Sequence, residues 1–171
     1  MATPAGPPRV IAQDGLVDAL VQASFVTMAV LSKVAAEHDL SLTQLRVLAI
    51  LRDRRVRMTR LADYLGLEKS TLTGLVDRAV KRGLLERGPN ADDGRAVDVF
   101  LSPRGAALAE RLYAQVGRSL SLLTGELSPA ERLQVQALLD RMLGPHEGHG
   151  HLSRIWCRKT GKSPRFCAPD P

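Results

Sequence analysis

The sequence contains few aromatic residues, which make up 4% of its 171 residues. A core with so few large rings must be filled mainly by Leu, Val and Ala, and such a core suits packed helices better than a β-sandwich or barrel. The chain also has only two cysteines, Cys157 and Cys167, both near its C-terminal end. No disulfide framework is therefore predicted for the body of the protein.

Targeting and catalytic signals are also lacking. The N-terminal residues MATPAGPPR have no signal-peptide run, and no uninterrupted apolar stretch approaches the length of a membrane span. We therefore expect a cytoplasmic protein with no membrane partner. The body offers no nucleophile, paired base or metal cluster at a recognisable spacing, so we expect no enzyme, catalytic residue, metal or cofactor.

The net charge of the chain is the first feature that indicates a class of binding partner. The chain carries a net charge of +6 and has an isoelectric point near 9.9, which favours a polyanionic partner. Between residues 41 and 101 there are twelve Lys or Arg and eight Asp or Glu. Most of the positive surplus therefore lies in this central segment.

The stretch from residue 59 to residue 83 has the pattern of two helices joined by a tight turn, TRLADYLGLEKSTLTGLVDRAVKRG. Leu61, Ala62 and Leu65 share one helical face, and Gly66 permits the positive φ that ends a helix. The helical period then resumes at four apolar positions, Leu72, Leu75, Val76 and Ala79. The pattern predicts a helix-turn-helix.

The second helix of this pattern leaves a polar face on its other side. That face carries Ser70, Thr71, Thr73, Gly74, Asp77, Arg78 and Lys81. A mixture of short polar and long basic side chains is suited to entering a DNA major groove. A solvated amphipathic helix is the commoner fate of any one such face, so the choice between them depends on the residues that follow.

Those residues predict a β-hairpin. LLER and AVDVFL have strand character, and GPNADDG between them is rich in turn formers. Val97, Val99 and Leu101 share one face of the second strand, while Asp98 and Phe100 share the other, so one side packs on the helices. The tip carries Asp92, Asp93 and Arg95. An arginine held there by neighbouring carboxylates suits a narrow minor groove; the alternative is an ordinary surface ion pair.

Further helices are predicted on both sides of this segment. Residues 15–37 carry two apolar stripes, more apolar surface than one small lobe covers, so we infer a second subunit. Ser41 to Gln44 form a capping box, Ser102 with Pro103 starts another helix, and Ser128 to Glu131 start the last. Inward positions are predicted at Leu45, Leu48, Ala49 and Leu51, then Leu108, Leu112, Val116 and Leu120, then Val135, Leu138, Leu139 and Met142.

A basic run, RDRRVRM, follows the predicted helix end near Arg52. Such a run either touches phosphates or forms a solvated charged surface, and the residues alone do not separate the two.

Taken together, these motifs resemble the MarR family of bacterial winged helix-turn-helix transcription regulators. The resemblance rests on MTRLADYLGLEKSTLTGLVDRAVKRGLLER and on the wing pattern DGRAVDVFLSPRG, and with the flanking helices it covers about residues 12–143. It implies a mainly α fold with a small β-hairpin wing. The implied parts are a helical dimerisation region, residues 12–40 and 102–143, and a winged helix-turn-helix DNA-binding lobe, residues 41–101.

The resemblance also implies a homodimeric regulator, usually a repressor, on a pseudo-palindromic operator. Recognition helices would enter successive major grooves of double-stranded DNA, and wings would enter the flanking minor grooves. The residues expected to contact DNA are Thr59, Lys69, Ser70, Thr71, Thr73, Gly74, Arg78, Lys81, Asp93 and Arg95.

A small aromatic or anionic effector is implied between the helical platform and the DNA-binding lobe. The sequence does not identify its binding site. Phe25, Met28 and Tyr113 are candidate walls because large side chains are few, although core packing is the better default.

The two ends of the chain carry no clear period. Residues 1–11 are predicted as a flexible arm and residues 144–171 as a disordered tail. The tail contains His146, His149, His151, Cys157 and Cys167, but their spacing matches no zinc signature, so a mobile basic tail is the preferred interpretation. Two other functions stay open: a winged-helix protein-interaction adaptor, and a DNA-binding regulator that senses oxidants or metal through this tail.

Overall fold

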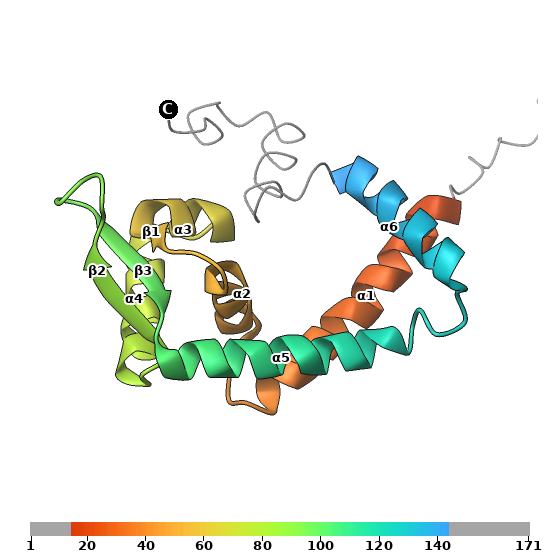
Figure 1. Ribbon diagram of the computed structural model, residues 1–171, viewed down its shortest axis with the longest axis horizontal. Helices are drawn as coiled ribbons and strands as arrows, with labels where there is room; N and C mark the ends of the chain where they lie inside the picture. The colour runs from red at the N-terminus through yellow and green to blue at the C-terminus, as the bar shows by residue number, and fades with distance from the viewer. Residues whose placement is uncertain (1–14, 144–171) are drawn as a thin grey trace, which may run out of the picture.

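The computed structural model describes residues 15–143 and has the predicted fold class, mainly helical with a small antiparallel sheet (Figure 1). The predicted arm and tail, with the His and Cys residues of the tail, lie outside the described residues. The elements are α1 Gly15–Ala36, α2 Leu42–Leu51, β1 Val56–Arg57, α3 Met58–Leu65, α4 Lys69–Lys81, β2 Leu85–Pro89, β3 Val97–Leu101, α5 Pro103–Ser121 and α6 Pro129–Leu143.

One hydrophobic core joins the helix-turn-helix to its neighbours. Its fully buried side chains include Leu51 of α2, Leu61 of α3, Leu72 and Val76 of α4, and Leu112 of α5. The C-terminal end of α1 enters the same core, where Val34 and Ala35 are buried. Helix α5 therefore belongs to the core at its N-terminal half and leaves it at its C-terminal half, toward α6 (Figure 1).

The sheet has three strands in the order β1-β3-β2, one more than the predicted hairpin. The extra strand comes from the basic run: Val56 pairs with Val99, and Arg57 pairs with Asp98. Strand β2 pairs antiparallel with β3 from Leu85↔Leu101 to Pro89↔Val97. A strand of two residues is too short to show the alternating period of a β-strand, so no sequence pattern predicts it.

The predicted starts of α2, α5 and α6 are confirmed. Ser41 and Gln44 form a reciprocal capping box on α2, and Ser102 Oγ accepts the Gly105 N–H at 2.9 Å at the start of α5. At α6 the backbone N–H of Ser128 donates to Glu131 Oε2 at 2.8 Å. These local hydrogen bonds satisfy the N–H groups that a helix start leaves without partners.

Five inward assignments were wrong within this chain, one in α2 and four in α6. Ala49 is exposed, and Val47 and Ile50 of α2 are buried instead. Helix α6 has no buried residue at all: its four predicted inward side chains, Val135, Leu138, Leu139 and Met142, are all exposed. The amphipathic pattern of α6 therefore gives the helix an apolar face, and no other residue between 15 and 143 buries that face.

Helix α1 is exposed over most of its length, with Phe25 the most accessible of its large side chains at 70%. The apolar run of this helix is interrupted by the charged residues Asp18 and Lys33, yet the helix is long and apolar enough to span a membrane by length and composition alone, with a mean hydropathy of 1.6. One such helix is weak evidence of a span, since core helices of soluble proteins pass the same test. The burial of its last turn in the core argues for packing against protein.

Candidate nucleic-acid interface

The turn between α3 and α4 places one helix across the other. Gly66 has a left-handed backbone with φ of 66°, and its N–H and that of Leu67 bond back to carbonyls of α3. Leu61 and Ala62 on one side of the turn and Leu72 on the other are buried in the common core. The opposite face of α4 is thereby directed outward.

The exposed face of α4 contains the residues predicted for it. Lys69, Ser70, Thr71, Thr73, Arg78 and Lys81 are exposed, and Gly74 and Asp77 are half-buried; Thr59 is exposed on α3. No other part of the described chain covers these exposed side chains.

Side chains on this face already make local contacts. Thr73 Oγ1 donates to the Lys69 carbonyl at 2.8 Å, so its oxygen keeps its lone pairs as possible hydrogen-bond acceptors. A Cβ at Gly74 would lie 3.6 Å from Arg78 Nη1, which shows that the Arg78 guanidinium lies back along the helix at that point. Asp77 is paired with Arg87 of β2 at 2.7 Å, and this ion pair links α4 to the sheet.

The loop between β2 and β3 forms the wing, at the end of the sheet away from α5 (Figure 1). Arg95 is exposed there. The predicted contact between Arg95 and a neighbouring carboxylate is made by a different group of the arginine. Asp93 Oδ1 accepts the backbone N–H of Arg95 at 3.1 Å, and no ion pair of the Arg95 guanidinium occurs among residues 15–143. Asp93 thus fixes the backbone of the arginine and leaves its side chain to extend.

The arginines of the basic run after α2 contact different parts of the chain. Arg55 stacks on the Phe100 ring with its guanidinium carbon 3.7 Å from the ring centroid, and Arg57 donates to Asn90 Oδ1 at 3.0 Å. Arg54 makes two hydrogen bonds to the carboxylate of Asp53, at 2.8 and 2.9 Å. Both predicted interpretations of this run therefore omitted its structural role in the sheet.

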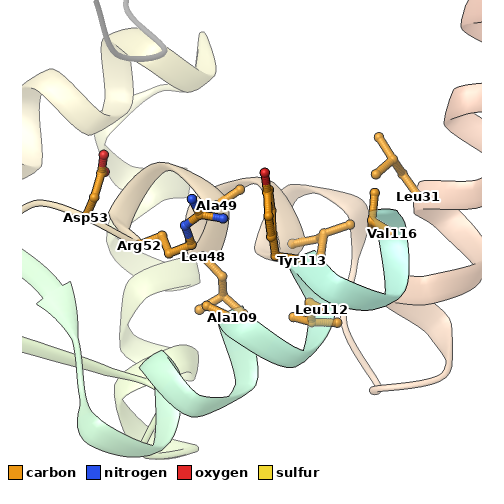
Figure 2. A pocket seen from close by; sticks show the side chains of 10 residues that line it. Leu31, Leu48, Ala49, Arg52, Asp53, Ala109, Leu112, Tyr113 and Val116 are labelled. Carbon is orange, nitrogen blue, oxygen red and sulfur yellow. The ribbon is translucent and has the colours of Figure 1, made fainter. Parts of the chain in front are cut away.

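A cavity of about 330 Å³ lies between α2 and α5 (Figure 2). Its lining is mainly apolar: Leu31, Leu45, Leu48, Ala49, Ala109, Leu112, Tyr113 and Val116, with Arg52 and Asp53. Of the three candidate walls, Tyr113 lines this cavity, whereas Phe25 and Met28 do not. The exposure of Ala49 is explained here, because its small side chain faces the cavity.

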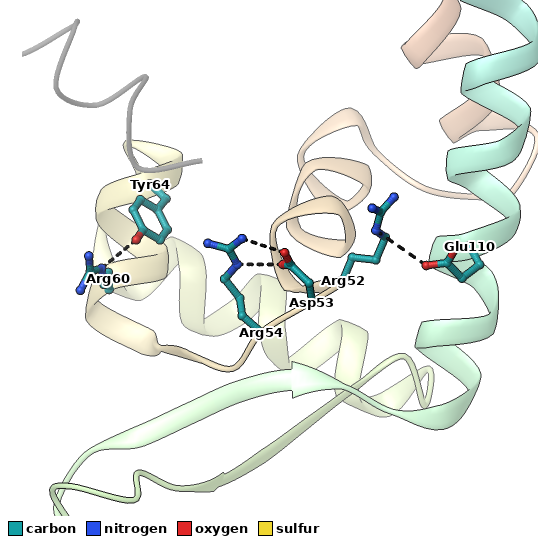
Figure 3. A network of polar contacts seen from close by, with 6 residues as sticks. All are labelled: Arg52, Asp53, Arg54, Arg60, Tyr64 and Glu110. Atoms are coloured by element: carbon teal, nitrogen blue, oxygen red, sulfur yellow. Dashed lines mark hydrogen bonds and ion pairs between the residues drawn. The ribbon is translucent and has the colours of Figure 1, made fainter. Parts of the chain in front are cut away.

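Arg52 supplies positive charge to the cavity from the C-terminal end of α2. Its guanidinium carbon lies 3.9 Å from the Tyr113 ring centroid, and its Nε lies 3.7 Å from Glu110 Oε1 (Figure 3). The hydrogen bond from Arg54 lowers the pKa of Asp53, so this neighbouring carboxylate is ionised at neutral pH. In the same group of polar contacts, Arg60 Nε donates to Tyr64 Oη at 2.7 Å.

Groups of His, Cys, Asp or Glu suited to a metal ion do not occur between residues 15 and 143. His38, the histidine near the end of α1, lies with its Nε2 3.0 Å from Gln115 Oε1 of α5. This contact ties α1 to α5, a role that the sequence did not indicate.

Comparisons with known proteins agree with this geometry. A sequence model described as "MarR family" matches residues 38–96. The multiple antibiotic resistance protein MarR of Salmonella typhimurium is 34% identical over 107 residues, which are 61% of this chain and 74% of that protein. A mutant MarR from E. coli, solved in complex with operator DNA, is 28% identical with a TM-score of 0.60, covering 76% of this chain and 94% of that one.

A second solved relative is BpsR of Bordetella bronchiseptica, from a structural study of how 6-hydroxynicotinic acid regulates its DNA binding. It is 28% identical with a TM-score of 0.60, and the match covers 80% of this chain and 97% of that chain. The similarity thus extends from the helix-turn-helix to the flanking helices.

Proposed function

The chain belongs to the MarR family of DNA-binding transcription regulators, and from this membership we propose a homodimeric, cytoplasmic repressor that binds a pseudo-palindromic operator and responds to a small effector. The observation that carries the proposal is the outward polar face of α4 beside a protruding wing with an exposed arginine. Family members act as regulators of transcription, which suggests that the chain is not an enzyme.

We assign DNA contacts to two surfaces. On the helix-turn-helix they are Thr59, Lys69, Ser70, Thr71, Thr73, Gly74, Arg78 and Lys81, and on the wing they are Asp93 and Arg95. The helix face suits a major groove because a short residue such as Gly74 lets the backbone approach, while a long basic one reaches base edges. Arg95 suits an adjacent minor groove, whose negative potential attracts a guanidinium.

We further assign residues 41–101 to the DNA-binding lobe and residues 12–40 and 102–143 to dimerisation. The cavity lies between these two parts, since α2 belongs to the proposed DNA-binding lobe and α5 to the proposed dimerisation region. A volume near 330 Å³ is at the lower end of the range for small-molecule sites. Arg52 favours an anionic group, and the apolar lining with Tyr113 favours a ring, so we propose a small aromatic anion as effector.

Selection of bound duplexes from a random pool, followed by binding measurements on the selected duplex, tests the function. Arg78→Ala and Thr73→Ala are each expected to cost about 1–3 kcal/mol at one base position, since a lost base contact relaxes specificity there. Lys69→Ala is expected to weaken binding to all sequences alike, because a phosphate contact carries no sequence information.

Lys33→Ala is the matched control, since it removes one positive charge from α1, away from the proposed interface. It is expected to leave the preferred sequence unchanged. Recovery of no preferred duplex, or unchanged affinity in all α4 variants, would show that α4 is not the reading helix.

A further inference from the structure

The wing loop is built around one side chain, Asn90, which the sequence did not single out. Its Oδ1 accepts three N–H groups: the Arg57 guanidinium at 3.0 Å and the backbone N–H groups of Asp92 and Asp93 at 3.1 and 3.0 Å. Its Nδ2 donates to both carboxylate oxygens of Asp98, at 2.9 and 3.1 Å. The side-chain amide therefore uses both of its ends, and each end faces a different kind of group.

Asp98 is one of the two buried polar or charged side chains among residues 15–143, with 7% of its surface exposed. A buried carboxylate is costly unless hydrogen bonds compensate for its lost hydration. The Asn90 amide supplies such bonds here. Asp98 lies in β3 opposite Gly88 of β2 and Arg57 of β1, so the anchored end of the network is the middle of the sheet.

The other end of the network reaches the helix-turn-helix. Arg57 is the last residue of β1 and the N-cap residue of α3, so its bond to Asn90 connects the wing to the first helix of that motif. Within the loop, the Asn90 N–H donates to the Ala96 carbonyl at 3.0 Å, and Asp93 accepts the N–H of Arg95. A chain of short contacts thus runs from α3 through Asn90 to the backbone of Arg95.

We propose that Asn90 is a positioning residue for DNA binding, which holds the wing loop so that Arg95 projects from a fixed point relative to α3 and α4. The proposal rests on the proposed role of Arg95 in contacting DNA. Its physical basis is preorganisation: a loop already fixed in the free protein loses less conformational freedom when its arginine is placed in a groove. Asn90 itself need not contact the duplex.

A double-mutant cycle on the full-length chain, measured by fluorescence anisotropy with the selected duplex over a salt series, tests this role. Arg95→Ala is expected to weaken binding and to flatten the dependence of log affinity on log salt, by about 0.9 for each phosphate charge no longer neutralised. Asn90→Ala is expected to weaken binding about five- to tenfold and to flatten the same slope. The double variant is expected to bind no more weakly than Arg95→Ala alone, because the two residues act through one contact.

An exchange of the two side chains separates positioning from simple disruption. Asn90→Asp places two carboxylates together and is expected to weaken binding. The pair Asn90→Asp with Asp98→Asn restores one amide and one carboxylate, keeps the net charge, and leaves an acceptor facing Arg57 and the two loop N–H groups. Wild-type affinity and salt slope are expected to return in this exchange variant.

Val97→Ala is the matched control, since it trims an exposed side chain of β3 outside the network and is expected to leave affinity unchanged. Circular dichroism and thermal melting verify that each variant is folded at the assay temperature. If Arg95→Ala alone has no effect, the proposed function of the wing is wrong. If Arg95→Ala weakens binding while folded Asn90→Ala does not, or if their losses add, the positioning role is wrong.

Discussion

At the scale of single residues, Gly105 in the first turn of α5 is the glycine with the least room for a side chain among those the structure describes. A Cβ built there would lie 1.9 Å from the carbonyl oxygen of Leu84, which already accepts the Ser102 N–H at 3.1 Å. Ser102 Oγ also donates to the Gly83 carbonyl at 2.6 Å. The start of α5 is thereby fixed against the turn that leads from α4 into β2.

Gly105→Ala is therefore expected to destabilise the protein by at least about 1–3 kcal/mol, the usual cost of overpacking, because backbone must move to admit the methyl group. Chemical denaturation at one protein concentration measures the change. Gly117→Ala on the same helix is the control: its Cβ meets nothing within 4 Å, so removing a flexible glycine is expected to stabilise by about 0.5–1 kcal/mol. Equal stability in the two variants would contradict the assigned role of Gly105.

Glycine also shows what single residues reveal in a sequence. Gly66 was predictable, because its need for positive φ follows from its place at the end of a helical period. Gly105 was not, since its constraint comes from a carbonyl twenty-one positions earlier in the chain. Asn90 was hidden for the same reason: a turn-forming residue is expected in any hairpin loop, and only the folded sheet places Asp98 and Arg57 around it.

At the scale of elements, the cavity depends on how α2 lies against α5. The stack of Arg52 on Tyr113 and its approach to Glu110 are contacts between these two helices, so a ligand that binds the guanidinium binds at the contact between α2 and α5. We therefore propose that an effector bound there changes how α2 lies against α5. Such a ligand acts on DNA binding only if its affinities for the two arrangements differ.

We expect an aromatic carboxylate, with benzoate as the probe, to bind this cavity and to weaken operator binding. Arg52→Gln is expected to reduce the ligand affinity about tenfold or more, because a charge-assisted hydrogen bond is lost. Arg52→Lys is expected to recover part of it, since charge remains but stacking on Tyr113 is poorer. Isothermal titration calorimetry measures both, with Arg111→Ala, an exposed arginine of α5 outside the cavity lining, as control.

The same ligand response in Arg52→Gln and in the unmodified protein would place the effector elsewhere.

The cavity itself could not be predicted from sequence. The amphipathic period of α2 identifies Leu45 and Leu48 as inward, but it cannot say that the gap beyond Ala49 stays unfilled. Helix starts were predictable because a capping box is local, whereas β1 was not, because its two residues are a strand only through their pairing with β3.

At the scale of the whole molecule, the apolar surface is divided unevenly. The helix-turn-helix lobe is well packed, while α1 and α6 expose Leu16, Val17, Leu20, Val21, Phe25, Val26, Met28, Leu133, Val135, Leu138, Leu139 and Met142. Large apolar side chains exposed in such number on two helices favour a protein partner. The surplus of apolar positions in α1 was readable in the sequence. The exposure of α6 was not readable in the sequence, because an amphipathic helix has the same period whether its apolar face packs against its own chain or against another chain.

Leu20 offers the sharpest test that the partner is a second copy. We expect the unmodified protein to sediment as a stable dimer at micromolar concentration, since a repressor on a pseudo-palindrome needs two-fold related reading helices about one helical turn apart. Leu20→Glu places a charge on the apolar side of α1 and is expected to dissociate the dimer or unfold it, because an unpaired charge cannot be buried without a large desolvation cost. Operator affinity should fall with it, since a monomer reads one half-site.

Gln22→Glu is the matched control, because it adds the same charge two positions further along, on the side of α1 that also carries Asp18 and Lys33. Phe25 and Val26 lie near it on α1, so it is expected to weaken the dimer less than Leu20→Glu does, because Gln22 is already polar. Leu112 is unsuitable for this test, although its apolar stripe suggested it, because it lies 2% exposed in the core of its own chain and a charge there would unfold the lobe directly. A folded, stable monomer of the unmodified protein in sedimentation equilibrium would contradict the dimer, and the exposed face of α1 and α6 would then require a different partner.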